Sequence, residues 1–179
     1  MLPPPFQPEP HILALGVRQP WAELILRGVK TLEVRSRKTQ IRGAIYLYAS
    51  RQSSNLLAAR EAASRQGVDV ARLPRGMIVG SVEICGCRPA EPTDAAAAQV
   101  AAELLWEQQV WHLTNPVRFE PPVPISMPPY GIWFYPFRGP SPGACRDELP
   151  AAALSEANAA CRLSPVTLVP WQQPASVDT

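Results

Sequence analysis

The feature that most constrains the fold is a change of hydrophobic period within residues 18–50, which read RQPWAELILRGVKTLEVRSRKTQIRGAIYLYAS. Apolar residues first recur at helical spacing, at Trp21, Leu24 and Ile25, and this spacing predicts a short amphipathic helix. Gly28 suits the end of that helix, where the backbone commonly turns into the left-handed region. The chain is therefore expected to enter this stretch as a helix and to change structure after the glycine.

After the helix the period becomes two, which predicts a strand over residues 31–35. Glu33 and Arg35 then share one face of that strand, and Lys30 lies at the turn before it. A second strand is predicted over residues 44–49, beyond a loop. This order of elements brings a carboxylate and two cations together on a short length of chain.

Basic residues are concentrated on the same stretch. The first 51 of the 179 residues carry eight Lys and Arg against three Glu, whereas the rest carry nine basic against twelve acidic side chains. Six of the basic residues fall within sixteen positions: Arg27, Lys30, Arg35, Arg37, Lys38 and Arg42. A local excess of this kind attracts phosphates and other anions, although a solvated surface loop would show the same run.

These residues resemble the signature of the ASCH domain family, a group of small PUA-like β-barrel modules. The family has a GxKxxExR core, which Gly28, Lys30, Glu33 and Arg35 match, and the RQPW-type entry often found ahead of it is present here too. The segments RGMIVGSVEICGC, WHLTNPVRFEPPVP and YGIWFY are similar to later strands of the family. The resemblance covers residues 12–137 and implies an α+β fold, with a mixed, mostly antiparallel β-barrel and two or three flanking helices.

The resemblance also implies a basic cleft that binds RNA or a nucleotide around this motif. The residues expected to bind the ligand are Arg18, Gln19, Trp21, Gly28, Lys30, Glu33, Arg35, Arg37, Lys38, Arg42 and Ser50. Among them, Trp21 could stack on a base at the cleft mouth. Arg37, Lys38 and Arg42 could hold phosphates. Lys30, Glu33 and Arg35 are also compatible with an ion-pair network that fixes the turn between the helix and the strand.

An enzyme is the first alternative. Some members of the superfamily are amidohydrolases of acetylated cytidine, in which the motif lysine works with a threonine three positions later and a distant glutamate. Lys30 matches the lysine, but Glu33 occupies the threonine position, which argues against a threonine nucleophile. Lys30 and Glu33 are therefore the candidate catalytic residues of an amidohydrolase or a nuclease, with the carboxylate activating water and the amine stabilising an oxyanion.

A protein-interaction module is the second alternative, because ASCH domains also occur in transcription coactivators. The Pro-rich ends of the chain would then be the contact segments. Residues 1–10, with five prolines, are expected to be a disordered leader, and residues 139–179 a poorly ordered Pro- and Ala-rich extension. The ASCH domain itself is expected to span residues 11–138.

Periodicity and capping signals predict the remaining elements, which are helices over 53–66 and 94–109, a strand over 77–84 and an aromatic strand over 130–137. Trp106 is expected to pack inward from the second of these helices. The segment from 117 to 129 carries five prolines, so any strand there should be short, bulged or at an edge.

Several kinds of site are not expected. Cys85 and Cys87 lie two residues apart on a predicted strand, so both side chains face the same side. Neither histidine has the spacing of a metal ligand, and no metal or other cofactor is therefore expected. The sequence has no apolar run of about 18 residues and no basic segment leading into an apolar core. Neither a membrane span nor a signal peptide is expected, and the expected location is cytoplasmic.

Overall fold

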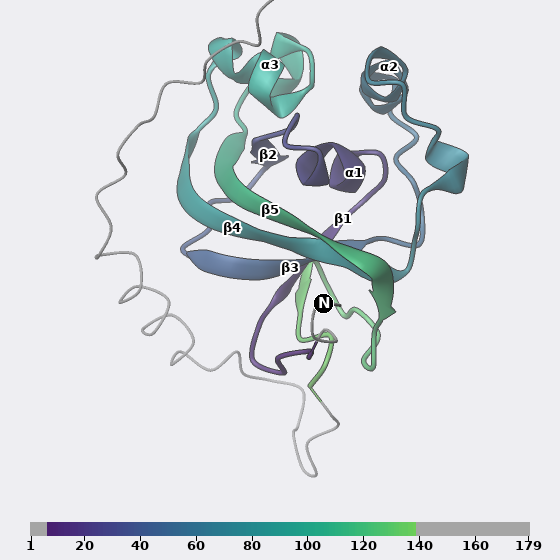
Figure 1. Ribbon diagram of the computed structural model, residues 1–179. Coiled ribbons are helices and arrows are strands. Elements are labelled where there is room, and N and C mark those ends of the chain that lie inside the picture. Colours follow the sequence, from purple (N-terminus) through teal and green to yellow (C-terminus); the bar gives the residue numbers. More distant parts are fainter. Residues whose placement is uncertain (1–6, 139–179) are drawn as a thin grey trace, which may run out of the picture.

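The computed structural model describes residues 7–138, in which a curled sheet of six strands wraps around a helix (Figure 1). The strands are β1 (Ala14–Val17), β2 (Leu32–Arg35), β3 (Gly43–Ala49), β4 (Met77–Pro89), β5 (Gln109–Pro124) and β6 (Trp133–Phe134). The α-helices are α1 (Trp21–Leu26), α2 (Leu57–Arg65) and α3 (Ala95–Ala98), and 3-10 helices cover Val70–Arg72, Pro92–Asp94 and Ala102–Leu105. The proposed extension at 139–179, and most of the proposed leader, lie outside the described residues.

The strands follow the order β2-β5-β4-β3-β1-β6 across the sheet. β1 pairs with β3 in parallel, and every other pairing between the six strands is antiparallel. The register shifts once between β3 and β4 and three times between β4 and β5, and such irregularities bend a sheet. The predicted α+β class, with a mixed and mostly antiparallel sheet, is therefore confirmed, and the sheet forms a half-barrel.

The sheet leaves a gap in this half-barrel between its edge strand β2 and the strand β1. β2 pairs with β5 on one side, and its other side faces β1 without a ladder of backbone hydrogen bonds. Arg35 crosses the gap, because its Nη2 donates a hydrogen bond of 2.9 Å to the carbonyl oxygen of Gly16 on β1. A side chain of the predicted motif therefore links the two strands that the backbone does not join.

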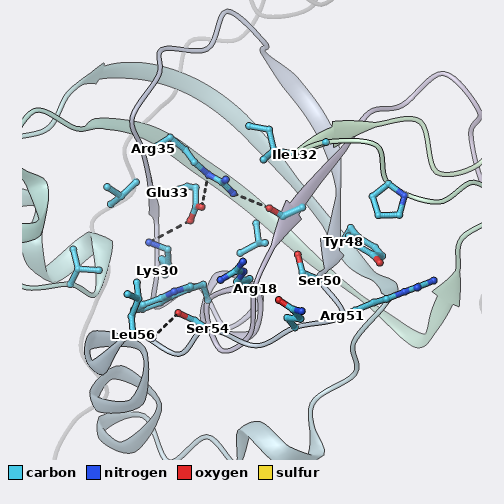
Figure 2. A pocket seen from close by; sticks show the side chains of 18 of the residues that line it. Arg18, Lys30, Glu33, Arg35, Tyr48, Ser50, Arg51, Ser54, Leu56 and Ile132 are labelled. Carbon is cyan, nitrogen blue, oxygen red and sulfur yellow. Dashed lines mark hydrogen bonds and ion pairs between the residues drawn. The ribbon is translucent and has the colours of Figure 1, made fainter. Parts of the chain in front are cut away.

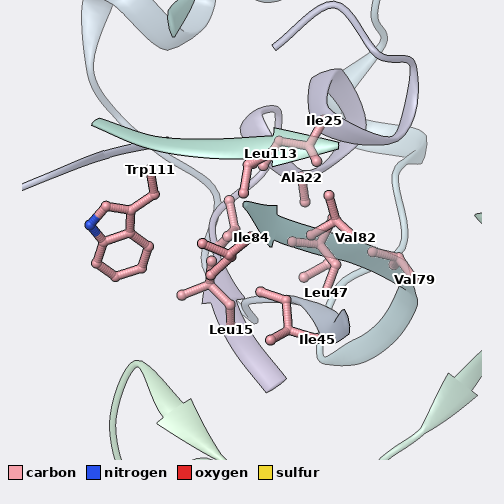
Figure 3. Close-up of a cluster of buried hydrophobic side chains, with 12 residues drawn as sticks. Leu15, Ala22, Ile25, Ile45, Leu47, Val79, Val82, Ile84, Trp111 and Leu113 are labelled. Carbon is pink, nitrogen blue, oxygen red and sulfur yellow. The ribbon is translucent and has the colours of Figure 1, made fainter. Parts of the chain in front are cut away.

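Side chains of β3 alternate between two apolar clusters, as the period of a strand requires. Ile45 and Leu47 face the inside of the half-barrel, where Ile25 of α1 and Trp111 of β5 pack with them (Figure 3). Tyr46 and Tyr48 face the other side, in a second cluster with Phe134. Burial on both faces fixes β3 in the centre of the fold and thereby fixes where its carboxyl end lies.

A glycine on β4 lies in close contact with both the neighbouring strand β5 and the last residue of α1. A Cβ atom at Gly80 would meet the carbonyl oxygen of Val117 and would lie 2.6 Å from the Cδ2 atom of Leu26. The missing side chain therefore allows β5 to pass close to β4 and leaves room for the Leu26 side chain at the end of α1.

Two predicted helices are shorter in the structure. The helix predicted over residues 53–66 starts later, because α2 begins after Leu56, and no side chain caps it. The alanine-rich helix also ends early, since Gln99 adopts a left-handed φ of 59° immediately after α3. Trp106 then lies 79% exposed rather than packed inward. By contrast, the proline-rich half of β5 runs along β4 beyond the end of β2, so it is at an edge as predicted.

No helix in the part of the chain that the structure describes is both long and apolar enough to cross a membrane.

Candidate functional site

A cleft of about 890 Å³ opens beside the gap between β2 and β1 (Figure 2). Its walls come from both of these strands, from the first residue of α1, from the segment after β3 and from the loop that precedes β6. The GxKxxExR motif supplies one wall, through Lys30, Glu33 and Arg35. The cleft therefore combines residues from opposite ends of the described chain.

The amine of Lys30 is surrounded by acceptors. Its side chain is 3% exposed, and its Nζ donates hydrogen bonds to the carbonyl oxygens of Leu32 at 2.7 Å and Ala98 at 2.8 Å. A third acceptor, the Oε2 of Glu33, lies 3.5 Å away. Three acceptors match the three N–H donors of an ammonium group, so the surroundings of Lys30 suit the charged form.

The pKa of Lys30 lies below its usual range. Burial has the largest effect, because the charged form is taken out of water, and the carboxylate of Glu33 opposes that shift only in part. The ring of Trp21 adds a further stabilising contact, with the Lys30 Nζ 5.2 Å from its centroid. The lysine is thus held on the wall of the cleft by contacts that need its positive charge.

Glu33 lies between two cations. Its Oε1 accepts a hydrogen bond of 3.0 Å from the Nε of Arg35, while its other oxygen faces Lys30. The guanidinium of Arg35 also lies over the ring of Trp111, 5.7 Å from the centroid. This is the arrangement of one carboxylate and two cations that the sequence predicts, and it gives the three side chains a net positive charge.

The structure brings six of the predicted ligand-binding residues to the cleft: Arg18, Trp21, Lys30, Glu33, Arg35 and Ser50. Four polar residues that the prediction omitted also line it: Tyr48, Arg51, Gln52 and Ser54. All four lie at or just after the end of β3. The polar run SRQSS at residues 50–54 was the available signal for the three that follow the strand.

Two predicted residues have structural positions instead. Gln19 is buried, and its Nε2 donates to the carbonyl oxygen of Pro74 at 3.0 Å. Its Oε1 accepts from the backbone N–H of Glu23 at 3.1 Å, so the side chain fixes the start of α1. Gly28 has a φ of 71° and turns the chain after α1, as the sequence predicts. Neither residue lines the cleft.

The remaining three predicted residues lie on the loop between β2 and β3, outside the cleft lining. Arg37 and Lys38 are exposed there. Arg42 donates hydrogen bonds to the backbone carbonyls of Thr39 and Ile41, which fold the loop onto itself. Their role in holding phosphates stays a prediction.

The rim of the cleft is apolar. Leu56, Leu104 and Ile132 line it and are all largely exposed, although each comes from a different loop or helix end. Large apolar side chains that converge around a concave site are typical of places where a ligand with flat or apolar parts binds. Among residues 7–138, no three His, Cys, Asp or Glu side chains lie together as a metal site would require.

A curled, mixed sheet with a polar cleft beside its open edge defines a small α+β module of the PUA-like kind. The family model described as the ASCH domain matches residues 15–123, and the chain belongs to this family. A comparison with curated proteins gave no match.

Among solved structures, the chain is similar to the crystal structure of ASCH from Zymomonas mobilis, with 14% identity and a TM-score of 0.42 over 65% of this chain and 75% of that chain. Two single-residue mutants of the same Zymomonas mobilis protein are also similar. One has 12% identity and a TM-score of 0.39, over 64% of this chain and 76% of that chain. The other has 14% identity and a TM-score of 0.41, over 66% and 77%.

Proposed function

We propose that the cleft binds RNA or a nucleotide. The observation that supports this most directly is the charge of its lining, where four cations and one carboxylate are found among the described residues: Arg18, Lys30, Arg35 and Arg51 against Glu33. An excess of positive charge in a concave site of low dielectric concentrates anions there. Phosphate groups are the anions that such an arginine-rich lining binds best.

The apolar part of the cleft supports a nucleotide over a simple anion. Trp21 is half-buried on the lining, and the exposed Leu56 and Leu104 line the same cleft. An aromatic ring and flat apolar surfaces can hold an unstacked base, which is how proteins commonly read single-stranded RNA. The charged and apolar parts therefore fit the two chemical parts of one ligand.

An RNA longer than the cleft could reach the basic loop after β2. Arg37 and Lys38 are exposed there and could contact the next phosphates of a chain that leaves the cleft. These contacts would add affinity without sequence preference.

The contacts of Lys30 and Glu33 support binding over acid–base catalysis. A general base needs a free lone pair, but the amine faces three acceptors and both carboxylate oxygens face cations. In this arrangement the pair is suited to holding a ligand and the walls of the cleft. The amidohydrolase and nuclease alternatives would need the pair to rearrange when substrate binds.

The test is a fluorescence anisotropy titration of labelled single-stranded and hairpin RNA at about 50 and about 200 mM salt. Trp21→Ala is expected to weaken binding of the single strand by roughly tenfold or more, because stacking contributes about 1–3 kcal/mol per base. In a plot of the logarithm of affinity against the logarithm of salt concentration, Arg18→Gln is expected to reduce the magnitude of the slope by about one. Arg60→Gln on α2, an exposed arginine outside the cleft, is the matched control and should bind as the wild type does.

Mass spectrometry of the same RNA samples separates binding from turnover. Unchanged RNA together with salt-sensitive binding would support the proposal. Loss of an acyl group from acetylated cytidine, or cleavage, that disappears in a Lys30→Ala variant which still melts cooperatively would replace the binding module with an enzyme. Absence of binding to every RNA and nucleotide tested, by a protein that still melts cooperatively, would overturn the proposal.

A further inference from the structure

The carboxyl ends of β1 and β3 meet at the cleft. The two strands are parallel and in register, so that Val17 lies beside Ala49, and the N–H of Ser50 donates to the carbonyl oxygen of Val17 at 2.8 Å. The residues that follow directly, Arg18 and Ser50, are therefore neighbours on adjacent strand ends. In folds that combine parallel strands with helices, the carboxyl ends of adjacent strands are a common position for ligand-binding groups.

Two arginines at these strand ends carry uncompensated charge. Arg18 and Arg51 are exposed residues that line the cleft, and within residues 7–138 neither side chain makes a hydrogen bond or an ion pair. Glu33 is the single acidic residue on the described lining, and it is already paired with Lys30 and Arg35. The positive charge at the ends of β1 and β3 thus has no partner among the described residues of the cleft.

A buried hydroxyl lies in the same part of the site. Tyr48 is 2% exposed and lines the cleft, yet its hydroxyl has no hydrogen-bond partner in the part of the chain described. Its ring is fixed by an edge-on contact with Phe134, with centroids 5.1 Å apart, so the ring is held in one orientation. Figure 2 shows Tyr48 on the same side of the cleft as Ser50 and Arg51, away from Lys30. A buried hydroxyl without a partner costs about 1–3 kcal/mol and is usually satisfied by a ligand or water.

From these three observations we infer that Arg18, Ser50 and Arg51 form a phosphate subsite, with Tyr48 behind it. The inference rests on the proposed function and makes it more specific, because it assigns the ligand a phosphate and gives it an orientation. The guanidinium groups bind the phosphate oxygens through charge-assisted hydrogen bonds, and the Ser50 hydroxyl donates another. The nucleoside then lies toward Trp21, which contacts Lys30 at the other side of the cleft.

The subsite predicts a preference for nucleotides over nucleosides. Isothermal titration calorimetry would compare UMP, CMP, AMP and GMP with the matching nucleosides, on the wild type and on Arg51→Gln and Ser50→Ala. We expect each nucleotide that binds to do so about tenfold or more tightly than its nucleoside, and Arg51→Gln to remove most of that advantage without changing nucleoside affinity. Tyr48→Phe should reduce the advantage by a smaller factor, and Arg60→Gln should leave it intact.

Binding of tetrauridylate with and without a 5′-phosphate distinguishes a terminal phosphate from an internal phosphodiester as the group that occupies the subsite. Tighter binding of the phosphorylated form, lost in Arg51→Gln, assigns the subsite to a terminal phosphate. Equal binding of both forms that Arg51→Gln weakens equally assigns it to an internal phosphodiester.

Equal affinity for nucleotide and nucleoside, or a phosphate advantage that survives Arg51→Gln, overturns the subsite while the proposed binding of RNA stands. Failure of all these probes and of longer RNA to bind overturns both. Thermal melting of each variant shows that it is folded. Because Arg51 is exposed, its replacement is expected to leave the melting temperature within about 2 °C of the wild type.

Discussion

Replacing Arg35 with lysine tests whether one side chain holds the open edge of the half-barrel together. Arg35 donates from Nε to Glu33 at 3.0 Å and from Nη2 to the carbonyl oxygen of Gly16 at 2.9 Å. The two bonds leave a rigid planar group in different directions, and the compact ammonium of lysine cannot make both with the same geometry. The substitution keeps the charge and therefore removes the bridge rather than the ion pair.

The size of the effect follows from the two interactions that a lysine at this position would not make. One charge-assisted hydrogen bond contributes about 1.5–3 kcal/mol, and the side chain is 22% exposed, which places its contribution near the lower end. The interaction between the guanidinium and the ring of Trp111 adds about 0.5–1 kcal/mol. Arg35→Lys is therefore expected to cost about 2 kcal/mol, which lowers the melting temperature of a domain of this size by roughly 6–10 °C.

Thermal melting and urea titration at neutral pH would measure this destabilisation. Arg37→Lys is the matched control, because it makes the same change two residues later on the exposed loop. The reasoning is refuted if Arg35→Lys melts within about 1 °C of both the wild type and this control. A double-mutant cycle with Glu33→Gln would separate the two bonds of the arginine, since only one of them depends on the carboxylate.

Three further substitutions test other parts of the structure. Gly80→Ala should lower the free energy of unfolding by about 1–3 kcal/mol in urea titrations, because the added Cβ would meet the backbone of Val117 and the side chain of Leu26. Wild-type stability would contradict the close packing around Gly80. Burial raises the pKa of Glu23, but hydrogen bonds from Arg118 and Arg27 outweigh it and bring the pKa below 4.5, so this stabilisation is present above about pH 4.5 and is lost as the pH falls through the lowered pKa. Glu23→Gln should therefore lower the melting temperature at neutral pH. As the pH falls, the melting temperature of the variant should drop less than that of the wild type. Curves of melting temperature against pH that run parallel for the two proteins would contradict this. Lys30→Met leaves two buried carbonyls without a donor and should destabilise by about 3–5 kcal/mol, more than Arg35→Lys does, and a smaller effect in the same titrations would contradict the role of the ammonium.

Elements with strong local signals were predictable from the sequence. The spacing of Trp21, Leu24 and Ile25 predicts α1, and Gly28 ends it with the positive φ that its position required. The alanine-rich segment before β5 shows where such signals fail. Its composition favours a long helix, but Gln99 turns the chain after four helical residues, and the segment continues as a 3-10 helix. Tertiary packing overrides propensity there.

The candidate site was predictable only in the part that one stretch of chain supplies. Lys30, Glu33 and Arg35 are close in sequence. Strand periodicity places Glu33 and Arg35 on one face, and Lys30 lies at the turn just before the strand. Arg51 and Tyr48 reach the same cleft because β3 pairs in parallel with β1. That pairing joins segments on either side of α1 and β2, and no local pattern reports it. The resemblance to the family suggested Ser50, and the structure adds its neighbours.

The gap beside β2 has a consequence for how this strand moves. β2 has four residues, a backbone partner on one side and side-chain contacts on the other. Segments held in this way open at a lower free energy than the centre of a sheet does, and their amide hydrogens exchange with solvent earlier. A ligand that contacts Lys30, Glu33 and Arg35 would stabilise the closed form of β2 and slow that exchange. Hydrogen–deuterium exchange at β2 would therefore report occupancy of the cleft for any unlabelled compound, including ligands that leave the overall melting temperature unchanged.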